Sequence, residues 1–217
     1  PDEVQRVDWH LLSAHSSITM IDVINNPKYE WDDRYLSSNP NITSNFILNE
    51  GKDRKWFVSS VCSNPGITTR DIFKSVLKPM FEWDYKNLSA NPNLPIIFVN
   101  DNLNQDWNYH SISVLSSLND LHKFHQIRWN AHGLSMNPNI SFEYVNEYPS
   151  IKWHKESLLM NPSIPLETIT NNIKWWDDIK FVEQYLSSNP TITFDWIKKN
   201  RLNVDWPRLS SNPINFG

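Results

Sequence analysis

Histidines are the residues of this chain best suited to metal binding or proton transfer. His122 and His125 stand three residues apart in "HKFH", a spacing that suits two ligands on one helix face. No cysteine or carboxylate cluster adjoins them, so the sequence predicts no metal site there. His110, His132 and His154 recur every 22 residues and can line up in a repeat, although His154 falls two places earlier within its unit.

Other catalytic groups are poorly supported. Asp177 and Asp178 in "WWDDIK" can pair as acid and base, but they lie in the longest interval between repeats, which favours a surface loop. A serine follows a leucine in most repeats without a base nearby. The sequence has no glycine-rich phosphate loop, no G-x-S-x-G and no convincing Cys-His pair. We therefore predict a non-enzymatic protein that uses no cofactor.

Composition narrows the class of protein further. The net charge of -4 argues against a dedicated partner of nucleic acid or of an anionic membrane. The single cysteine, Cys62, excludes an intrachain disulfide and favours a reducing compartment. No apolar run approaches the roughly 18 residues that a membrane span needs. The acidic start "PDEVQRVDWH" is unlike a signal peptide and has no initiator Met, so we expect a chain that is not secreted and that is processed or a fragment.

One short phrase recurs along the chain. "WDDRYLSSNPNIT" begins at Trp31, "WDYKNLSANPNLP" at Trp83 and "WNAHGLSMNPNIS" at Trp129. Aligned on the leucine-serine step, the repeats are 22 to 28 residues apart, a period typical of repeat arrays. Their anchors are Leu12, Leu36, Val61, Leu88, Ile112, Leu134, Leu158, Leu186 and Leu209.

An aromatic residue precedes most anchors by five places, and Asn-Pro follows most of them by three. We interpret these residues as structural: Trp and Leu as core, the serine as a small residue that allows close helix contact, and Asn as a donor to backbone groups at the turn. The first and fifth repeats lack Asn-Pro. The clearest structural sets are Trp31, Leu36, Asn39, Pro40; Trp83, Leu88, Asn91, Pro92; and Trp129, Leu134, Asn137, Pro138.

Each repeat carries the signals of two short helices. Asp32, Asp84, Asn108 and Asn130 suit a first N-cap, and the helix after Asp32 is expected over 33–38. Asn then ends the helix, because it tolerates the left-handed conformation and the following Pro disfavours a helical one. A second helix follows a Ser, Thr or Pro cap; its caps are Thr19, Thr43, Thr68, Pro95, Ser141, Pro165 and Thr193. Asp22 and Asp71 would complete capping boxes.

Helices this short persist only when the next repeat covers their apolar face. The sequence therefore predicts an all-α fold, an α-solenoid of about nine units in a single domain over 1–217. We expect an atypical first unit (1–30), an irregular fifth unit (about 107–128) and a truncated last unit (206–217). A leucine-rich-repeat alternative has a similar period but needs alternating L-x-L strands, which are absent.

Function is expected where the repeats differ, in the three residues before each anchor. Their central stretch mixes aromatic and cationic side chains, a composition found in interaction hot spots. A plain solvated face is the alternative for each residue. The candidate partner-binding residues are Arg34, Tyr85, Lys86, Tyr109, His110, His132, Lys155 and Glu156.

The phrases at Trp31 and Trp83, with "YLSSNPTITFDWIKKN" near the end, resemble the short Trp/Leu-Ser-x-Asn-Pro repeats of giant DNA viruses of the mimivirus-like kind. The resemblance runs from about Val7 to Phe216. It implies a viral repeat protein that is located in the host cytoplasm or in the virion, and it carries no assigned activity. The fifth repeat departs from the pattern.

We therefore expect a scaffold, adaptor or decoy that binds another protein. A structural virion component and an RNA-binding repeat, with Tyr85, Tyr109 and Tyr185 stacking on bases, are the alternatives. The chain stops where a further helix should begin, so we also expect the exposed C-terminal end to contact a partner or a second copy.

Overall fold

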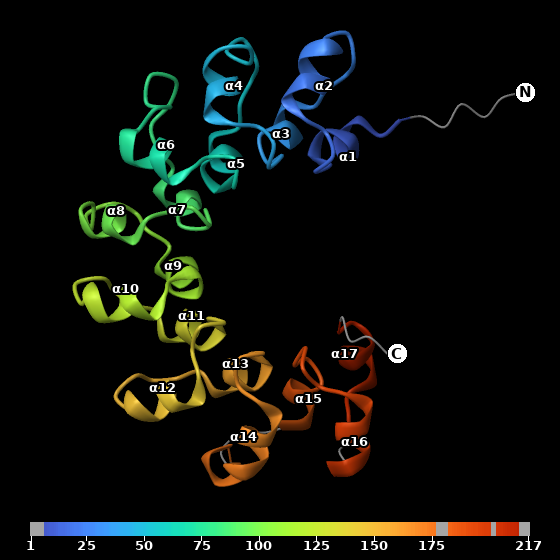
Figure 1. The fold of residues 1–217 in the computed structure, drawn as a ribbon, viewed down its shortest axis with the longest axis vertical. Coiled ribbons are helices and arrows are strands. Elements are labelled where there is room, and N and C mark those ends of the chain that lie inside the picture. Colours follow the sequence, from blue (N-terminus) through green and yellow to red (C-terminus); the bar gives the residue numbers. More distant parts are fainter. Residues whose placement is uncertain (1–6, 177–181, 201–202, 213–217) are drawn as a thin grey trace, which may run out of the picture. The chain divides into compact units, whose positions relative to one another are not determined.

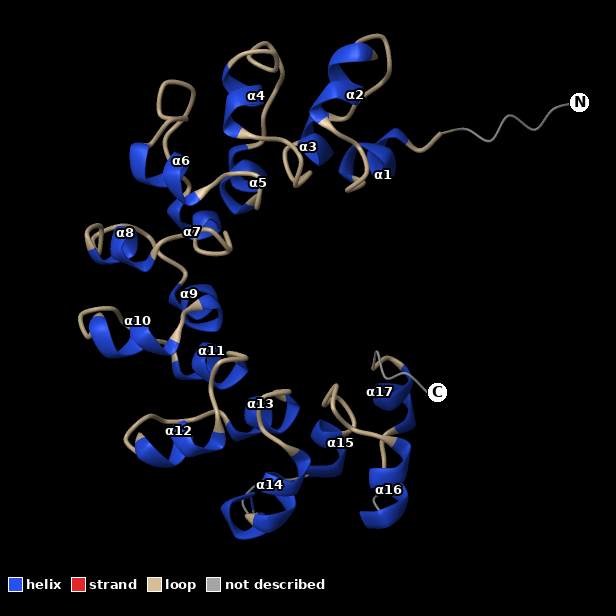
Figure 2. Cartoon of the chain, in the orientation of Figure 1, coloured by secondary structure: helices blue, strands red, loops and turns tan. Residues whose placement is uncertain are grey.

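The computed structural model describes residues 7–176, 182–200 and 203–212. Over these residues the chain is helical, with no strand, which confirms the predicted all-α class (Figure 1, Figure 2). It divides into two compact units, unit 1 over Pro1–Asn108 and unit 2 over Tyr109–Gly217. The assembly of all repeats into one solenoid remains a prediction.

Unit 1 consists of four helix pairs. Its helices are α1 (Trp9–Ala14), α2 (Met20–Asn25), α3 (Asp33–Leu36), α4 (Ser44–Leu48), α5 (Val58–Ser63), α6 (Thr69–Lys74), α7 (Tyr85–Leu88) and α8 (Ile96–Asn100). Within the unit, α1 packs against α3 and α5 packs against α7.

Unit 2 continues the alternation. Its helices are α9 (Tyr109–Leu115), α10 (Leu118–Lys123), α11 (Ala131–Met136), α12 (Phe142–Glu147), α13 (Lys155–Met160), α14 (Leu166–Asn171), η1 (Ile173–Trp176), α15 (Val182–Leu186), α16 (Phe194–Asn200) and α17 (Trp206–Ser210). The first helices α9, α11, α13 and α15 pack in sequence. All nine predicted anchors lie in the odd-numbered helices α1 to α17, and all except Leu12 are at most 3% exposed.

Local capping explains why such short segments are helical. Asp32, Asp84 and Asn130 accept backbone N–H bonds at the first turns of α3, α7 and α11. Thr19 and Thr68 form the predicted capping boxes with Asp22 and Asp71. The fifth repeat, which the sequence marked as irregular, has a third box between Ser117 and Asp120.

The expected left-handed asparagine is wrong. Asn64, Asn137 and Asn161 have φ between -77 and -69° and ψ between 121 and 126°, which is extended backbone. The following proline imposes this conformation. The first helix is also shorter than expected, since α3 ends at Leu36 instead of Ser38.

The recurrent asparagine joins neighbouring repeats. Asn64 Nδ2 donates to the carbonyl oxygens of Ser37 and Asn39 in the preceding repeat, both at 2.9 Å, while its Oδ1 accepts from Gly66 N at 2.7 Å. Asn91 and Asn161 repeat the pattern on the carbonyls one repeat earlier. Because these amides are at most 2% exposed, each replaces water for two backbone acceptors.

The recurrent serine makes a second link. Its hydroxyl donates to the carbonyl four residues earlier in its own helix, as Ser135 Oγ does to Ala131 at 2.8 Å. It also accepts the backbone N–H at the N-cap of the next repeat, as from His154 N at 2.9 Å. The other serines that accept in this way are Ser13, Ser37, Ser89, Ser113 and Ser187, at 2.8–3.0 Å. The small side chain predicted to permit close contact therefore also bonds the repeats together.

Tryptophans that precede the first helices donate hydrogen bonds to the turn that follows the preceding second helix. Trp31 Nε1 donates to the carbonyl of Asn26 at 2.9 Å, and Asn26 is the C-cap of α2. Trp56, Trp107, Trp129 and Trp153 bond the carbonyl five residues earlier in the same way, at 2.8–3.2 Å. The indole thus adds a second donor to a carbonyl that already accepts the backbone N–H three residues later, as Asn26 does from Tyr29 at 3.2 Å. Trp83 and Trp107 are buried, and Trp31 and Trp129 are half-buried.

The fifth repeat keeps the link to its successor despite its missing Asn-Pro. Helix α9 is seven residues long, and its turn ends at Ser116. Asn137 still finds two carbonyl acceptors there, on Ser113 and Ser116, both at 2.7 Å. Helix α9 is one residue longer than α11 and α13, and the asparagine bonds to the fifth repeat are nevertheless kept.

Replacing Asn64 by Ala should destabilise the protein by about 2–4 kcal/mol. The substitution removes the partners of the Ser37 carbonyl and the Gly66 N–H, and each buried group left unpaired costs about 1–3 kcal/mol. The Asn39 carbonyl keeps its bond from Ile42 N. Urea unfolding followed by circular dichroism measures the change. Asn25→Ala, at the exposed end of α2, is the matched control and should change the free energy of unfolding by less than about 0.5 kcal/mol. Equal effects of the two substitutions would contradict the bridging role.

Cys62 occupies the serine position of the third repeat. Its sulfur accepts from Asp84 N at 3.4 Å, and burial raises the pKa of its thiol to about 11. Cys62→Ser should keep stability within about 1 kcal/mol, because the hydroxyl has the partners seen in the other repeats. Cys62→Val should cost about 1–3 kcal/mol, because it leaves the Asp84 N–H without an acceptor. Denaturant midpoints in which Val is better tolerated than Ser would refute this assignment.

Candidate functional site

The predicted partner-binding residues occupy equivalent places at the start of the first helices. Arg34, Lys86, His110, His132 and Glu156 are each the second residue of their helix. Tyr85, Tyr109 and Lys155 are each the first residue. The prediction therefore selected two structurally equivalent positions. Their binding of a partner stays a prediction.

Side chains at the second position reach the N-cap residue of the next repeat. In unit 1, His10 Nδ1 lies 2.5 Å from Asp32 Oδ2, and the Arg34 guanidinium lies 5.4 Å from the centre of the Phe57 ring. Asp32 and Phe57 are the N-caps of α3 and α5. This row thus consists of residues in contact from one repeat to the next and is more than a set of separate solvated side chains.

In unit 2 the same geometry produces a row of histidines. His110 Nδ1 lies 3.3 Å from Oδ1 of the N-cap Asn130, and the rings of His110 and His132 are 5.0 Å apart. The rings of His132 and His154 are 4.3 Å apart. His154 is the N-cap of α13, which explains why it joins the row from a place two residues earlier in its repeat.

The first-position residues are less available than the sequence suggested. Tyr85 is half-buried and packs edge-on against Trp107, with ring centres 5.0 Å apart. Lys155 places its Nζ 4.4 Å from the centre of the Trp175 ring and donates to the Trp175 carbonyl at 2.6 Å. These two side chains belong to the packing between repeats, so the exposed part of the candidate face depends mainly on the second position.

Electrostatics within the histidine row disfavour protonation of its central member. Partial desolvation of the ring by its neighbours, followed by the charges of His154 and His110, lowers the pKa of His132, while Glu156 opposes the shift. Glu156 Oε2 lies 3.6 Å from His154 Nε2. The described residues contain no group of three or more His, Cys, Asp or Glu side chains arranged to hold a metal ion.

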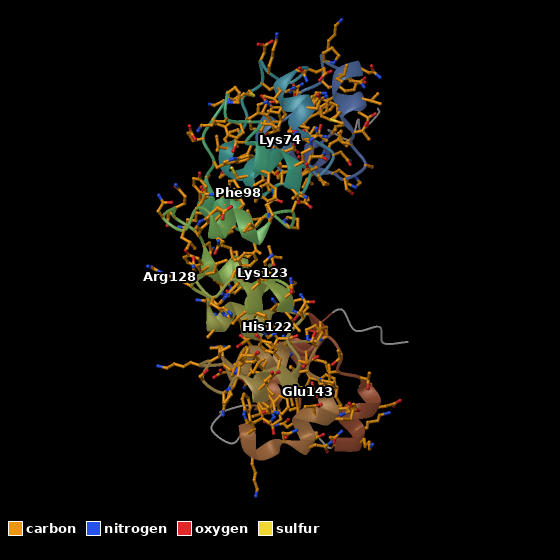
Figure 3. All side chains as sticks on the ribbon, turned by 60° about the vertical axis from the view of Figure 1, so that its left-hand side comes forward. Lys74, Phe98, His122, Lys123, Arg128 and Glu143 are labelled. Atoms are coloured by element: carbon orange, nitrogen blue, oxygen red, sulfur yellow. The ribbon has the colours of Figure 1, made fainter. Side chains whose placement is uncertain are left out.

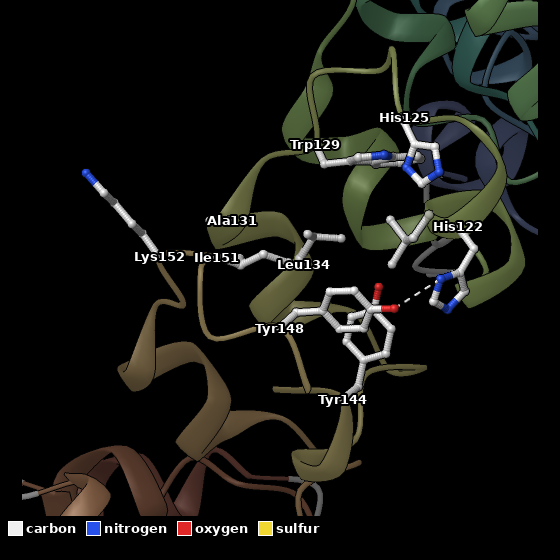
Figure 4. Close-up of a pocket in the computed structure, with 10 residues that line it drawn as sticks. His122, His125, Trp129, Ala131, Leu134, Tyr144, Tyr148, Ile151 and Lys152 are labelled. Atoms are coloured by element: carbon white, nitrogen blue, oxygen red, sulfur yellow. Dashed lines mark hydrogen bonds between the residues drawn. The ribbon is translucent and has the colours of Figure 1, made fainter. Parts of the chain in front are cut away.

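A second candidate site is a pocket of about 490 Å³ in unit 2, between α10, α11 and α12. His122 and His125, considered above as metal ligands, lie at this pocket. His122 Nδ1 is 3.3 Å from the Tyr148 hydroxyl, and the rings of Tyr144 and Tyr148 stack 4.5 Å apart. Ten residues line the pocket: Leu121, His122, His125, Trp129, Ala131, Leu134, Tyr144, Tyr148, Ile151 and Lys152 (Figure 4).

Sequence reasoning missed this pocket. Two sequence signals mark it together. The third residue of α10 is Asp120, where α4, α8 and α12 have Phe46, Phe98 and Tyr144, and no aromatic residue stands two places before Trp129. Asp177 and Asp178, which the sequence assigns to a surface loop in preference to an acid-base pair, lie outside the described residues.

No protein-family model matches the chain, and no curated protein and no solved structure shows detectable similarity to it. The resemblance to giant-virus repeats therefore rests on the repeated phrases alone. Across the described helices, none combines the length and the apolar character that a bilayer span demands.

The histidine row predicts a pH dependence of stability. Because the pKa of His132 is lower in the folded protein than in the unfolded chain, the unfolded chain binds this proton more tightly between the folded-state pKa and about pH 6.5. The free energy of unfolding should therefore fall as the pH drops through that window. His132→Gln should flatten this fall, measured by urea unfolding at several pH values.

His125→Gln is the matched control for His132→Gln, since His125 lies outside the histidine row. The control should retain the pH dependence of the wild type. If His132→Gln retains it as well, protonation of His132 does not cause the pH dependence of the free energy of unfolding.

Proposed function

We propose that this chain is a non-enzymatic scaffold that binds another protein along the starts of its first helices. The observation that supports this function most is the row of His110, His132 and His154, in which side chains from three successive repeats are in ring contact. His132 and His154 are exposed, so the row presents a continuous polar and aromatic strip to solvent.

Each repeat separates recurrent residues that hold the fold together from variable residues at the surface, and this separation supports the same function. The recurrent Asn and Ser side chains are occupied by backbone groups, as Asn161 and Ser135 illustrate. The second positions vary between repeats and lie at the starts of the first helices, where Arg34, Lys86 and His132 are exposed. Repeat proteins commonly place variable binding residues on a surface formed by successive units.

The repeat phrases further lead us to propose a viral protein that acts in the cytoplasm of the infected host or within the particle. A virion component and a host-directed adaptor both use protein contacts, so the same surface serves either role. An RNA partner is less well supported, because phosphate contacts supply most of the affinity of such complexes and the chain carries a net charge of -4.

Photo-crosslinking tests the proposed face. With p-benzoylphenylalanine in place of His132, ultraviolet light should join the protein to a partner in lysate of infected host cells. The same amino acid in place of Asn146, exposed on α12, is the matched control and should give no such product. Excess unmodified protein should compete the product away, and excess of a His110→Ala, Glu156→Lys variant should compete at least tenfold less well.

Digestion of the crosslinked product identifies the class of partner. A product that survives nuclease and is destroyed by protease supports a protein partner. A nuclease-sensitive product would instead establish RNA binding. Equal crosslinking from positions 132 and 146 would contradict the assigned face.

A further inference from the structure

The pocket in unit 2 is formed mainly by aromatic and aliphatic side chains. Leu121 and Leu134 are buried on α10 and α11, and the stacked rings of Tyr144 and Tyr148 form one side. Figure 4 shows Trp129 on the opposite side, with His125 next to it. The volume of about 490 Å³ lies within the range of roughly 300–1,000 Å³ usual for ligand sites.

Comparison between repeats shows that an aromatic ring is missing beside Trp129. Phe46 packs on Trp56, Phe98 on Trp107 and Tyr144 on Trp153, with ring centres 6.0–6.3 Å apart. In each pair, the first residue is the third of its helix, and the tryptophan follows that helix.

Two repeats with Asp at that third position obtain a ring from elsewhere. Trp31 contacts Tyr29, and Trp83 contacts Phe81, which in both cases stands two residues before the tryptophan. In the fifth repeat the third position is Asp120, committed to the capping box with Ser117.

Ile127 stands two residues before Trp129, so that source of a ring is also absent. Trp31, Trp56, Trp83, Trp107 and Trp153 each contact an aromatic ring in this way. Among the described residues, no aromatic ring makes such a contact with Trp129. The pocket thus lies where an aromatic neighbour is found in other repeats. A ring supplied by a ligand would restore a contact that this fold makes repeatedly.

The charges at the pocket favour an anionic group next to that ring. The titratable side chains of its lining are His122, His125, Lys152 and two tyrosines, and none of the ten lining residues is acidic. Figure 3 marks three basic residues, His122, Lys123 and Arg128, on α10 and the loop after it. Burial raises the pKa of Tyr144, with smaller contributions from Tyr148 and from Glu147, and Glu147 does not line the pocket.

We propose that this pocket binds an aromatic side chain of a protein partner, adjacent to an Asp or Glu of the same partner. The proposal rests on the protein-binding function proposed above and names the chemistry that would be recognised. The ring packs between Trp129 and the tyrosine pair. The carboxylate lies at the rim toward Lys152, which Figure 4 shows on the side of the pocket away from the two histidines.

Nuclear magnetic resonance with small probes tests the site in the full-length protein. The indole N–H signal of Trp129, assigned with Trp129→Phe, should shift saturably with N-acetyltryptophan at millimolar concentrations. N-acetyltryptophanamide should bind about two- to fivefold more weakly, as expected for loss of one exposed ion pair. N-acetylleucine should cause no saturable shift. Equal shifts with the leucine probe, or no shift with any probe, would overturn the proposal.

Substitutions localise the effect. Ala131→Phe should fill the pocket from within and abolish the shift caused by N-acetyltryptophan. Met136→Phe adds a ring to the same helix at an exposed residue outside the lining and should leave binding unchanged. Lys152→Glu, at an exposed side chain that tolerates change, should remove the preference for the carboxylate over the amide. Retained binding in Ala131→Phe would place the probe elsewhere.

A displayed peptide library identifies the source of the ring. Selection on the wild type should enrich Trp, Tyr or Phe next to Asp or Glu, and selection on Ala131→Phe should not. Probe binding without such enrichment would exclude a protein side chain as the occupant. Crosslinking at position 132 would be unaffected by that result, so failure of the pocket and failure of the proposed scaffold function are separable.

Discussion

The bond from a buried asparagine amide to two carbonyls of the preceding repeat is the interaction on which the other features depend. Isolated helices of four to seven residues are unstable in water. Asn64 and its equivalents fix the turn of one repeat against the turn of the previous one, and the serine hydroxyl fixes the following N-cap. The helices are thus held at both ends, and the buried anchors fill the space between them.

These bonds fix how each repeat is placed against the next, and this placement also determines which variable side chains are in contact. The start of each first helix lies beside the N-cap of the next, so a second-position side chain contacts an N-cap side chain one repeat later. His10 and Asp32 in unit 1, and His132 and His154 in unit 2, are instances of one geometry with different chemistry. A surface for a partner therefore arises from the same contacts that hold the repeats together.

The sequence predicted the helix pairs and most of their caps, because those signals are local and recur in register. It failed on the conformation of Asn64, where the effect of the next proline outweighs the tolerance of asparagine for a left-handed turn. The spacing of 22 residues indicated that His132 and His154 can line up. Their ring contact depends on how an N-cap residue lies beside the preceding first helix, which no single repeat reveals. The pocket beside Trp129 was not predicted because it depends on a ring that the fifth repeat lacks.

The acceptors of the asparagine bridge are main-chain carbonyls, present whatever residue occupies the site. Asn189 accordingly bonds Leu159, where other repeats have serine or cysteine. A complete repeat can therefore be duplicated or deleted, and the new neighbours will find equivalent partners without any compensating substitution. Such a protein can change its length in whole steps during evolution, while each step brings a new set of exposed residues for selection to act on.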